Sequence, residues 1–447
     1  MSFPRYPSYK DSGVEWLGEV PEHWTAIPIK HVGRLKGGAG FPHEKQGFEG
    51  EELSFHKVNA LAQADSDGFL IDSENTIDRA TAKELGAFVF PAGTVVFAKV
   101  GAALLLGRIR LLGHNACLDN NMMGLVARED EFEVPFVRYA MNLVRFDLIA
   151  NPGTVPSLNE GQIGDFRLAM PPLGEQTQIA AFLDRETAKI DALVAEQRRL
   201  MELLKEKRQA VISHAVTKGL NPNAPMKPSG IEWLGDVPEH WDVSKMKWVA
   251  EMQSGHTPDK KIPAYWDGGD ISWVSLNDTG YLKDNDYISE TAYNITQLGI
   301  DNSSARILPA GIVVFSRDAT IGRCAITTKP MAVSQHFIAW VCGETMVPTF
   351  LLLRLRSMTG ELDRLTTGAT LKTIGMPDVR TLVTPVPPLS EQKTIVAYLA
   401  EQTVQLDTLI TETQHAIDLL QERRTALISA AVTGQIDVRH LTAERAA

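Results

Sequence analysis

Cysteine is scarce in this sequence, with three cysteines among 447 residues. Cys117, Cys324 and Cys342 stand alone, without a Cys-x-x-Cys pair and without a common spacing in the two halves of the chain. A disulfide framework or a zinc ribbon needs paired or clustered cysteines, so the sequence excludes both. Isolated thiols are typical of buried residues in a reducing compartment, and we expect a cytoplasmic protein.

Long apolar runs are missing as well. No stretch reaches the roughly 18 apolar residues that a membrane-spanning helix needs. The first residues also lack the basic and then apolar layout of a secretory signal, so we expect no contact with a membrane. Hydrophobic residues make up 44% of the chain, which is enough for a sizeable core in each half.

The familiar catalytic motifs are absent too. There is no Gly-x-x-x-x-Gly-Lys-Ser/Thr phosphate loop, no Gly-x-Gly-x-x-Gly after a strand, no His-Glu-x-x-His and no Gly-x-Ser-x-Gly. We therefore predict no catalytic residue, no metal site and no cofactor in this chain, with an enzyme of unrecognised site as an open alternative. The net charge of −11 disfavours nucleic acid as a partner without excluding a local basic groove.

What the sequence does contain is a long internal repeat. Residues Ser12 to Trp24 return as Ser229 to Trp241, a shift of 217 residues, with only two differences that keep charge or apolar character. A repeat with so long a period indicates a tandem duplication of whole domains rather than a solenoid of small units. The four tryptophans of the repeat are expected to be packing anchors, and His23 and His240 to make structural hydrogen bonds.

A second repeated segment precedes two stretches without proline or glycine. Pro171–Gln176 recurs as Pro387–Gln392, and the stretches that follow run to about residues 217 and 432. Paired prolines followed by an acidic residue favour the start of a helix. Apolar residues then recur at spacings of three, four and seven, which predicts two long antiparallel coiled-coil helices and a pseudo-twofold internal repeat. The seam residues are Leu183, Ile190, Leu193, Leu200, Leu204 and Val211 in the first helix, and Ile395, Leu399, Leu406, Leu409, Leu420 and Leu427 in the second.

The remaining parts of each half are rich in short apolar runs bounded by Gly, Pro, Asn and Asp. These runs predict strands at residues 27–32, 88–90, 95–98 and 123–126, with a helix over residues 135–144. The predicted fold class is therefore α+β, with two similar globular domains joined by the two long helices. The boundaries are a first globular domain at 1–170, a helix at 171–219, a linker and second globular domain at 220–386, a helix at 387–434 and a tail at 435–447.

Polar and basic residues stand at matching loop positions in the two halves. Each could be an ordinary solvated residue, but recurrence at equivalent places favours a shared function. Such side chains suit DNA recognition, because Arg, Asn, Gln and Ser pair with base edges and Lys and Arg pair with phosphates. The candidate DNA-binding residues are Lys99, Asn120, Asn121, Ser157, Asn159, His256, Thr257, Lys260, Arg317, Gln335, His336, Thr370 and Lys372.

These features together resemble the DNA specificity subunit of a type I restriction-modification system. The resemblance rests on Gly-x-Glu-Trp-Leu-Gly-x-Val-Pro-x-x-Trp in both halves, the Leu/Phe-Pro-Ala-Gly-x-Val-Val-Phe segment, and Pro-Pro-Leu-x-Glu-Gln at 171 and 387. The loop Gly-Ala-Thr-x-Lys-x-Ile at 368–374, the segments 255–258 and 317–322, and Trp273 extend it in the second half. The first half departs from the pattern, with Gly38-Ala39-Gly40 and residues 99–103 in place of the corresponding loops.

The resemblance implies a division of labour. Each globular domain would be a target recognition domain that binds one half of a bipartite asymmetric DNA site. The helices would set the half-site spacing and dock two methyltransferase subunits, which bind S-adenosylmethionine and methylate adenine at N6. Restriction subunits that use ATP and Mg would complete the complex. The main alternative is a scaffold that binds no DNA and carries two interaction domains on a coiled coil.

Overall fold

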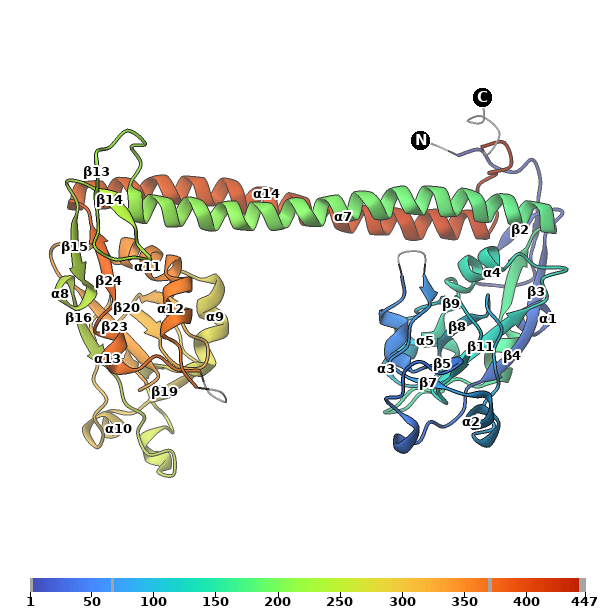
Figure 1. Ribbon diagram of the computed structural model, residues 1–447, viewed down its shortest axis with the longest axis horizontal. Helices are drawn as coiled ribbons and strands as arrows, with labels where there is room; N and C mark the ends of the chain where they lie inside the picture. Colours follow the sequence, from blue (N-terminus) through green and yellow to red (C-terminus); the bar gives the residue numbers. More distant parts are fainter. Residues whose placement is uncertain (1–2, 66–67, 369–371, 442–447) are drawn as a thin grey trace. The chain divides into compact units, whose positions relative to one another are not determined.

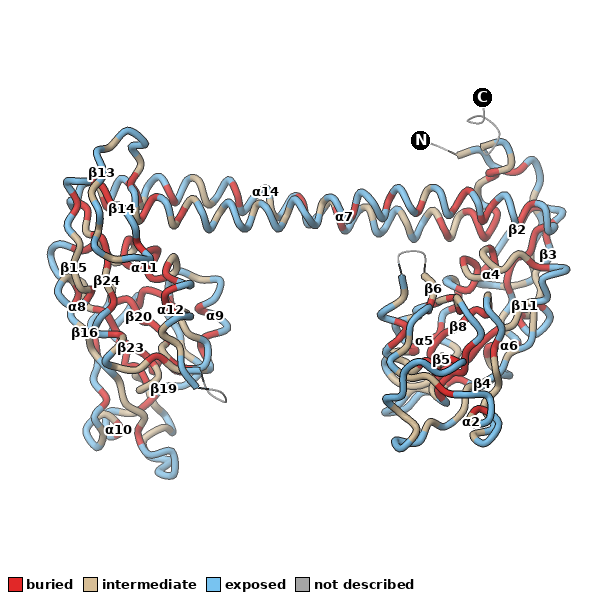
Figure 2. Tube along the Cα trace, viewed as in Figure 1, coloured by how far each residue is buried: buried red, intermediate tan, exposed pale blue. Residues whose placement is uncertain are grey.

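The computed structural model describes residues 3–65, 68–368 and 372–441 (Figure 1). The chain divides into two compact units. The first unit contains Met1–Gln197 together with Ala416–Ala447, and the second unit contains Arg198–His415. In each unit, buried segments follow the strands and one side of the long helices, while the loops are exposed (Figure 2).

The first unit is built on a five-stranded sheet with the order β4-β11-β8-β9-β6. Its strands are β4 (Gly33–Gly37), β11 (Met122–Ala127), β8 (Val95–Ala98), β9 (Arg110–Leu112) and β6 (Phe69–Leu70). A second sheet has three strands, β10 (Ala116–Leu118), β5 (Leu53–His56) and β7 (Thr76–Ile77). Two further pairs of strands are β1 (Tyr9–Asp11) with β2 (Glu19–Pro21), and β3 (Thr25–Pro28) with β12 (Arg167–Met170). The short helices are α1 (Ile29–Val32), α2 (Arg79–Glu84), α3 (Ala102–Leu105), α4 (Val134–Met141), α5 (Phe146–Ile149) and α6 (Glu160–Asp165).

The second unit repeats this plan strand for strand. Its five-stranded sheet has the order β16-β23-β20-β21-β18, from β16 (Ala250–Ser254), β23 (Phe337–Cys342), β20 (Val313–Ser316), β21 (Cys324–Thr327) and β18 (Tyr287–Ile288). Its three-stranded sheet contains β19 (Tyr293–Ile295), β17 (Ile271–Val274) and β22 (Ala332–Val333). The two further strand pairs are β13 (Met226–Pro228) with β14 (Asp236–Pro238), and β15 (Asp242–Lys245) with β24 (Val383–Val386). Helices α8 (Met246–Val249), α9 (Thr279–Asp284), α10 (Gln297–Asp301), α11 (Pro348–Ser357), α12 (Thr359–Leu365) and α13 (Met376–Val379) complete it. The prediction of two similar α+β domains is confirmed.

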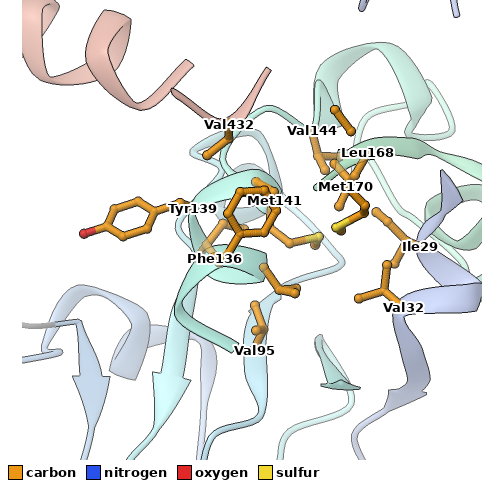
Figure 3. Packing of buried hydrophobic residues seen from close by; sticks show 14 of the residues in the cluster. Ile29, Val32, Val95, Phe136, Tyr139, Met141, Val144, Leu168, Met170 and Val432 are labelled. Carbon is orange, nitrogen blue, oxygen red and sulfur yellow. The ribbon is translucent and has the colours of Figure 1, made fainter. Parts of the chain in front are cut away.

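The core of the first unit brings the sheet, α4 and the long helices together. Val95 of β8, Phe136 and Met141 of α4, Leu168 of β12 and Val432 all belong to one cluster of buried apolar residues (Figure 3). Each of these five side chains is at most 1% exposed. Burial on this scale is the main stabilising contribution to the domain, at roughly 1.5–3 kcal/mol for each large apolar side chain.

The two long helices are α7 (Leu173–Lys218) and α14 (Leu389–Val432). In the first unit the beginning of α7 packs on the end of α14, and in the second unit the end of α7 packs on the beginning of α14, so the pairing within each unit is antiparallel. Arg424 contacts Asp191 at 2.9 Å in the first unit, and Arg208 contacts Asp407 at 2.7 Å in the second. The two pairs correspond under a shift of 216 residues, which is also the shift between Pro171–Gln176 and Pro387–Gln392. The two ion pairs show that α7 and α14 pair in the same register in both units. Exposed ion pairs of this kind contribute little to the stability of the helix pair.

The seam of the helix pair differs from the predicted one at three positions. Leu193, Leu200 and Leu409 are 51%, 43% and 46% exposed. In the first unit, Val194 is buried instead of its neighbour Leu193, in a cluster with Ile190 and Ile417. The seam steps by four residues from 190 to 194 rather than by three, and a one-residue step moves a side chain about 100° around the helix. The prediction of those three leucines as seam residues was wrong.

Two predicted strands also differ from the structure. Residues 88–90 form no strand, and only Phe90 makes an isolated bridge, to Ala116. The predicted strand at 27–32 ends at Pro28, after which α1 forms one helical turn closed by the Gly33 amide on the Ile29 carbonyl. The other predicted segments, at 95–98, 123–126 and 135–144, are confirmed as β8, most of β11 and α4.

The repeated motif anchors each unit to the first turn of a long helix. Trp24 and Trp241 are fully buried, and their indole nitrogens donate to Glu175 at 3.2 Å and to Glu391 at 3.0 Å. His23 and His240 bond to the same two carboxylates, each at 2.8 Å. A carboxylate at a helix N-terminus also interacts favourably with the helix dipole. These residues are the structural anchors that the sequence predicts.

The other two tryptophans of the motif are only partly covered. Trp16 is 42% exposed and stacks on Phe166 at 4.9 Å, whereas Trp233 is 36% exposed and lies 5.0 Å from the guanidinium of Arg354. Among the described residues, none of the helices has the length and apolar character that crossing a bilayer requires.

Candidate nucleic-acid interface

The candidate residues gather where one central strand ends and its neighbour begins. In the first unit, the Lys99 amide after β8 donates to the Asn121 carbonyl before β11 at 2.8 Å. In the second unit, the Arg317 amide after β20 donates to the His336 carbonyl before β23 at 3.0 Å. These bonds extend the antiparallel ladder between the two strands by one residue pair. The side chains of both loops therefore lie at the same edge of the sheet.

A third loop closes this edge in the same way in both units. The Leu158 amide donates to the Lys99 carbonyl, and the Ile374 amide donates to the Arg317 carbonyl, both at 2.9 Å. Further bonds of 2.8 Å run from the Gly101 amide to the Pro156 carbonyl and from the Ala319 amide to the Lys372 carbonyl. Gly101 and Ala319 both have positive φ, of 79° and 60°, so the turn itself is shared. We call these three loops the recognition edge; they contain residues 99–101, 120–121 and 156–159 in the first unit, and 317–319, 335–336 and 372–374 in the second.

In the first unit the recognition edge presents mainly amides and one lysine. Lys99 and Asn121 are half-buried and Asn120 is exposed. Ser157 is half-buried, and its carbonyl accepts the Asn151 amide at 2.8 Å. Asn159 caps α6 in a reciprocal capping box with Gln162, so its side-chain oxygen is already engaged in holding the loop.

In the second unit the same edge carries a connected polar network around buried Asp318. Its carboxylate accepts from His336 Nδ1 at 2.8 Å and from the Thr373 hydroxyl. Gln335 Nε2 lies 3.3 Å from His336 Nε2, and the Thr257 hydroxyl bonds to Gln335 Oε1. Arg317 reaches two backbone carbonyls, those of Gln335 and Ile374, both at 3.2 Å. The guanidinium therefore ties the loops together as well as contributing charge.

A cavity of about 650 Å³ opens beside this network. It is lined by four of the candidate residues, Thr257, Lys260, Gln335 and His336. His256 takes part through its backbone, because its carbonyl accepts from Trp273 Nε1 at 3.0 Å. Lys372 is exposed on the neighbouring loop. Thr370 lies outside the described residues.

Sequence reasoning missed other residues that line this cavity. Trp266 packs edge-on against Trp273 with ring centroids 5.1 Å apart, and Tyr293 is 52% exposed on β19. Asn277 and Asn294 add amide groups to the wall. The available signal was divergence between the halves, because residues 263–269 have no close counterpart in the first half.

Two cysteines are buried in the sheets of the two units. Burial raises the pKa of the Cys117 thiol, two residues before Asp119, to about 11, and burial does the same for Cys324. Both thiols are therefore neutral packing groups at physiological pH. In the described ranges, no three His, Cys, Asp or Glu side chains gather into a group that could hold a metal ion.

Comparison with known proteins gives one consistent result. Residues 21–201 and 238–418 each match the family described as Type I restriction modification DNA specificity domain. The putative type I restriction enzyme MjaX specificity subunit of Methanocaldococcus jannaschii is 20% identical over 95% of this chain and 96% of its own length. The MjaVIII specificity subunit of the same organism is 23% identical over 74% of this chain and 76% of its own. The MjaIX specificity subunit is 30% identical, over 37% of this chain and 39% of its own length.

Two solved structures share the fold. One is a chain described under "Structural basis underlying complex assembly and conformational transition of the type I R-M system", with a TM-score of 0.64 and 18% identity over 92% of this chain and 98% of that one. The other is the HsdS subunit from Thermoanaerobacter tengcongensis, with a TM-score of 0.54 and 18% identity over 93% of this chain and 98% of that one.

Proposed function

The chain belongs to the type I restriction-modification DNA specificity family, and we propose that it is the specificity subunit of such a system. Each unit reads one half of a bipartite DNA site. The observation that carries this assignment is the pair of recognition edges, which share one backbone frame but carry different side chains. Identical readers would select identical half-sites, whereas Lys99 with Asn121 and Arg317 with His336 present different groups. The site is therefore asymmetric.

The polar residues of each edge divide between two tasks. Lys260 and Lys372 are exposed cations of the second unit that suit phosphate contacts, which position a protein on DNA without reading sequence. Asn120, Asn121 and Gln335 carry amides that can pair with base edges in the major groove. The net charge of −11 is compatible with this arrangement, because partner subunits can supply positive surface of their own.

We assign the spacing of the two half-sites to α7 and α14. Both helices run without proline or glycine over nearly all of their length, and an uninterrupted helix converts residue number into distance at about 1.5 Å per residue. The exposed faces of the same helices are the proposed docking sites for two methyltransferase subunits.

The chemistry of the system belongs in this proposal to the other subunits. Methyltransferase subunits would bind S-adenosylmethionine and methylate adenine at N6, and restriction subunits would use ATP and Mg. The named relatives are specificity subunits of type I restriction enzymes, which supports a role for this chain beside other subunits. The proposed location is the cytoplasm. The chain itself acts by recognition.

A selection experiment tests the proposal. The full-length chain is expressed with the methyltransferase subunits of its system and is used to select duplexes from a random library, followed by sequencing. The expected result is one motif with two different half-sites and a fixed gap of unspecified bases. Bound duplexes without any sequence preference would instead support the scaffold alternative.

A further inference from the structure

We infer that Gln335 reads an adenine in the half-site of the second unit, and that Thr257, His336 and Asp318 hold its amide in the orientation this requires. The inference rests on the proposed function. It adds to that function the residue that reads, the base that is read and the contacts that position the reading side chain. It starts from the hydrogen bonds that connect Gln335 to Thr257, His336 and Asp318.

The directions follow from the buried carboxylate outward. Asp318 is 4% exposed, and an ionised carboxylate can only accept, so His336 Nδ1 donates to it across 2.8 Å. In the tautomer that carries its proton on Nδ1, the other nitrogen, Nε2, is an acceptor. The group 3.3 Å from it is the Gln335 amide nitrogen, which donates. The amide oxygen of Gln335 is thereby turned to the Thr257 hydroxyl, which donates to it.

This network leaves Gln335 with one donor and one acceptor to spare. A glutamine amide has two N–H groups and two oxygen lone pairs, and among the described residues His336 takes one N–H and Thr257 takes one lone pair. The remaining N–H and lone pair match adenine, which offers the N7 acceptor and the N6 donor side by side in the major groove. Guanine offers two acceptors at the same place, so one lone pair would face another.

The surroundings of Gln335 suit a base edge. Its side chain forms part of the wall of the 650 Å³ cavity together with Thr257, Lys260 and His336. The backbone is fixed as well, because the Gln335 carbonyl accepts from Arg317 Nε at 3.2 Å. A side chain held on both amide atoms and at its carbonyl loses little conformational entropy on binding, which sharpens discrimination between bases.

The equivalent position of the first unit lacks this arrangement. Asn120 stands where Gln335 stands, and it is exposed and one methylene shorter. Asn121 replaces His336, and the nearby Asp119 carboxylate accepts the Asn121 backbone amide at 2.8 Å instead of a ring nitrogen. The two units therefore read different bases through the same stretch of backbone. This difference also supplies a matched control.

The decisive variant is Gln335→Glu in the full chain, expressed with its methyltransferase subunits and used to select duplexes from a random library. A carboxylate only accepts, so it pairs with the N4 amine of cytosine and loses adenine. The wild type should show adenine at one position of one half-site. The variant should show cytosine there, with the preference for adenine reduced roughly 5- to 150-fold, which corresponds to the discrimination of a good bidentate contact.

Two further variants separate reading from structure. Asn120→Asp makes the same chemical change at the equivalent place, and should leave the position altered by Gln335→Glu untouched. Thr257→Val keeps the shape but removes the hydroxyl, so adenine should still be preferred at that position, but less strongly, with the other half-site unchanged.

The outcomes distinguish this inference from the proposed function. If the wild type selects a bipartite motif and Gln335→Glu changes no position of it, Gln335 is not a reading residue and the inference is wrong. A motif that changes equally in both half-sites would overturn it too, since that result indicates a general structural effect. If the wild type selects no motif, it is the proposed function that fails.

Discussion

At the scale of single residues, some positions of the repeat make the same contacts in both units, whereas others make different contacts. Trp24 and Trp241 have the same role in both units, since each is buried and bonded to a glutamate in the first turn of a long helix. The surroundings of Trp16 and Trp233 differ, because the ring of Trp233 lies against the guanidinium of a buried arginine. Arg354 is 1% exposed, and its Nε and Nη2 atoms have no hydrogen-bond partner among the described residues.

This arginine gives a prediction about stability. Burial lowers the pKa of Arg354 to about 9, so the folded chain holds a poorly compensated positive charge at neutral pH. The guanidinium donates a hydrogen bond from Nη1 to the Ser357 hydroxyl at 2.8 Å, and an apolar side chain of similar length would remove the cost of burying the charge. Arg354→Met should therefore leave the free energy of unfolding unchanged or raise it by about 1 kcal/mol, as measured by denaturant or thermal unfolding at pH 7.5.

The pH dependence has a definite sign. The folded-state pKa of Arg354 lies below its unfolded value, so the destabilising contribution is complete below about pH 9 and fades as the pH rises above it. Any advantage of Arg354→Met should shrink between pH 7.5 and pH 10. Arg364→Met is the control, because that guanidinium is exposed and pairs with Glu361 at 2.7 Å. A loss of more than about 2 kcal/mol in Arg354→Met would show that the guanidinium is well compensated.

At the scale of elements, the long helices were the easiest part to predict and their contact face the hardest. Their ends follow from the paired prolines, the acidic residue after them and the glycines that come next in the sequence, and in the structure α7 spans Leu173–Lys218 and α14 spans Leu389–Val432. The seam was missed at Leu193 because Val194 beside it is also apolar, and periodicity alone cannot choose between neighbours. Only packing against Ile417 on the second helix decides it.

The helix register leads to a prediction about DNA spacing. The pairs Asp191–Arg424 and Arg208–Asp407 set the point on α14 that faces each point on α7. Four helix-forming residues inserted between Leu200 and Met201, and four between Gln414 and His415, should lengthen both helices by about 6 Å in register. The gap between half-sites should grow by about two base pairs, at about 3.4 Å each, while both half-site sequences stay the same.

The same library selection measures this, with an insertion in α7 alone as the control. That single insertion shifts one helix past the other and should lower stability rather than change the spacing. A double insertion that alters the bases of either half-site would mean that the helices take part in reading, against the division of labour argued here.

At the scale of the whole molecule, the duplication could be predicted in outline but the differences between the copies could not. Residues 12–24 and 229–241 place the start of each copy, and the strand orders of the two units agree element by element. The cap of α6 by Asn159 is a local Asn-x-x-Gln pattern, but the bonds from His336 to Asp318 and from Thr257 to Gln335 join loops 18 and 78 residues apart in the sequence. Such contacts leave no periodic signal, so the sequence pointed to the recognition edge without ordering its side chains.

The central claim is that two independent readers share one frame, and a chimera tests it most directly. Residues 226–386 are replaced by the corresponding region of another family member with a different target, and the full chimera is used with its methyltransferase subunits to select duplexes from a random library. The account predicts that one half-site changes to that of the donor, while the other half-site and the gap stay as in the wild type. A change in both half-sites would contradict the account.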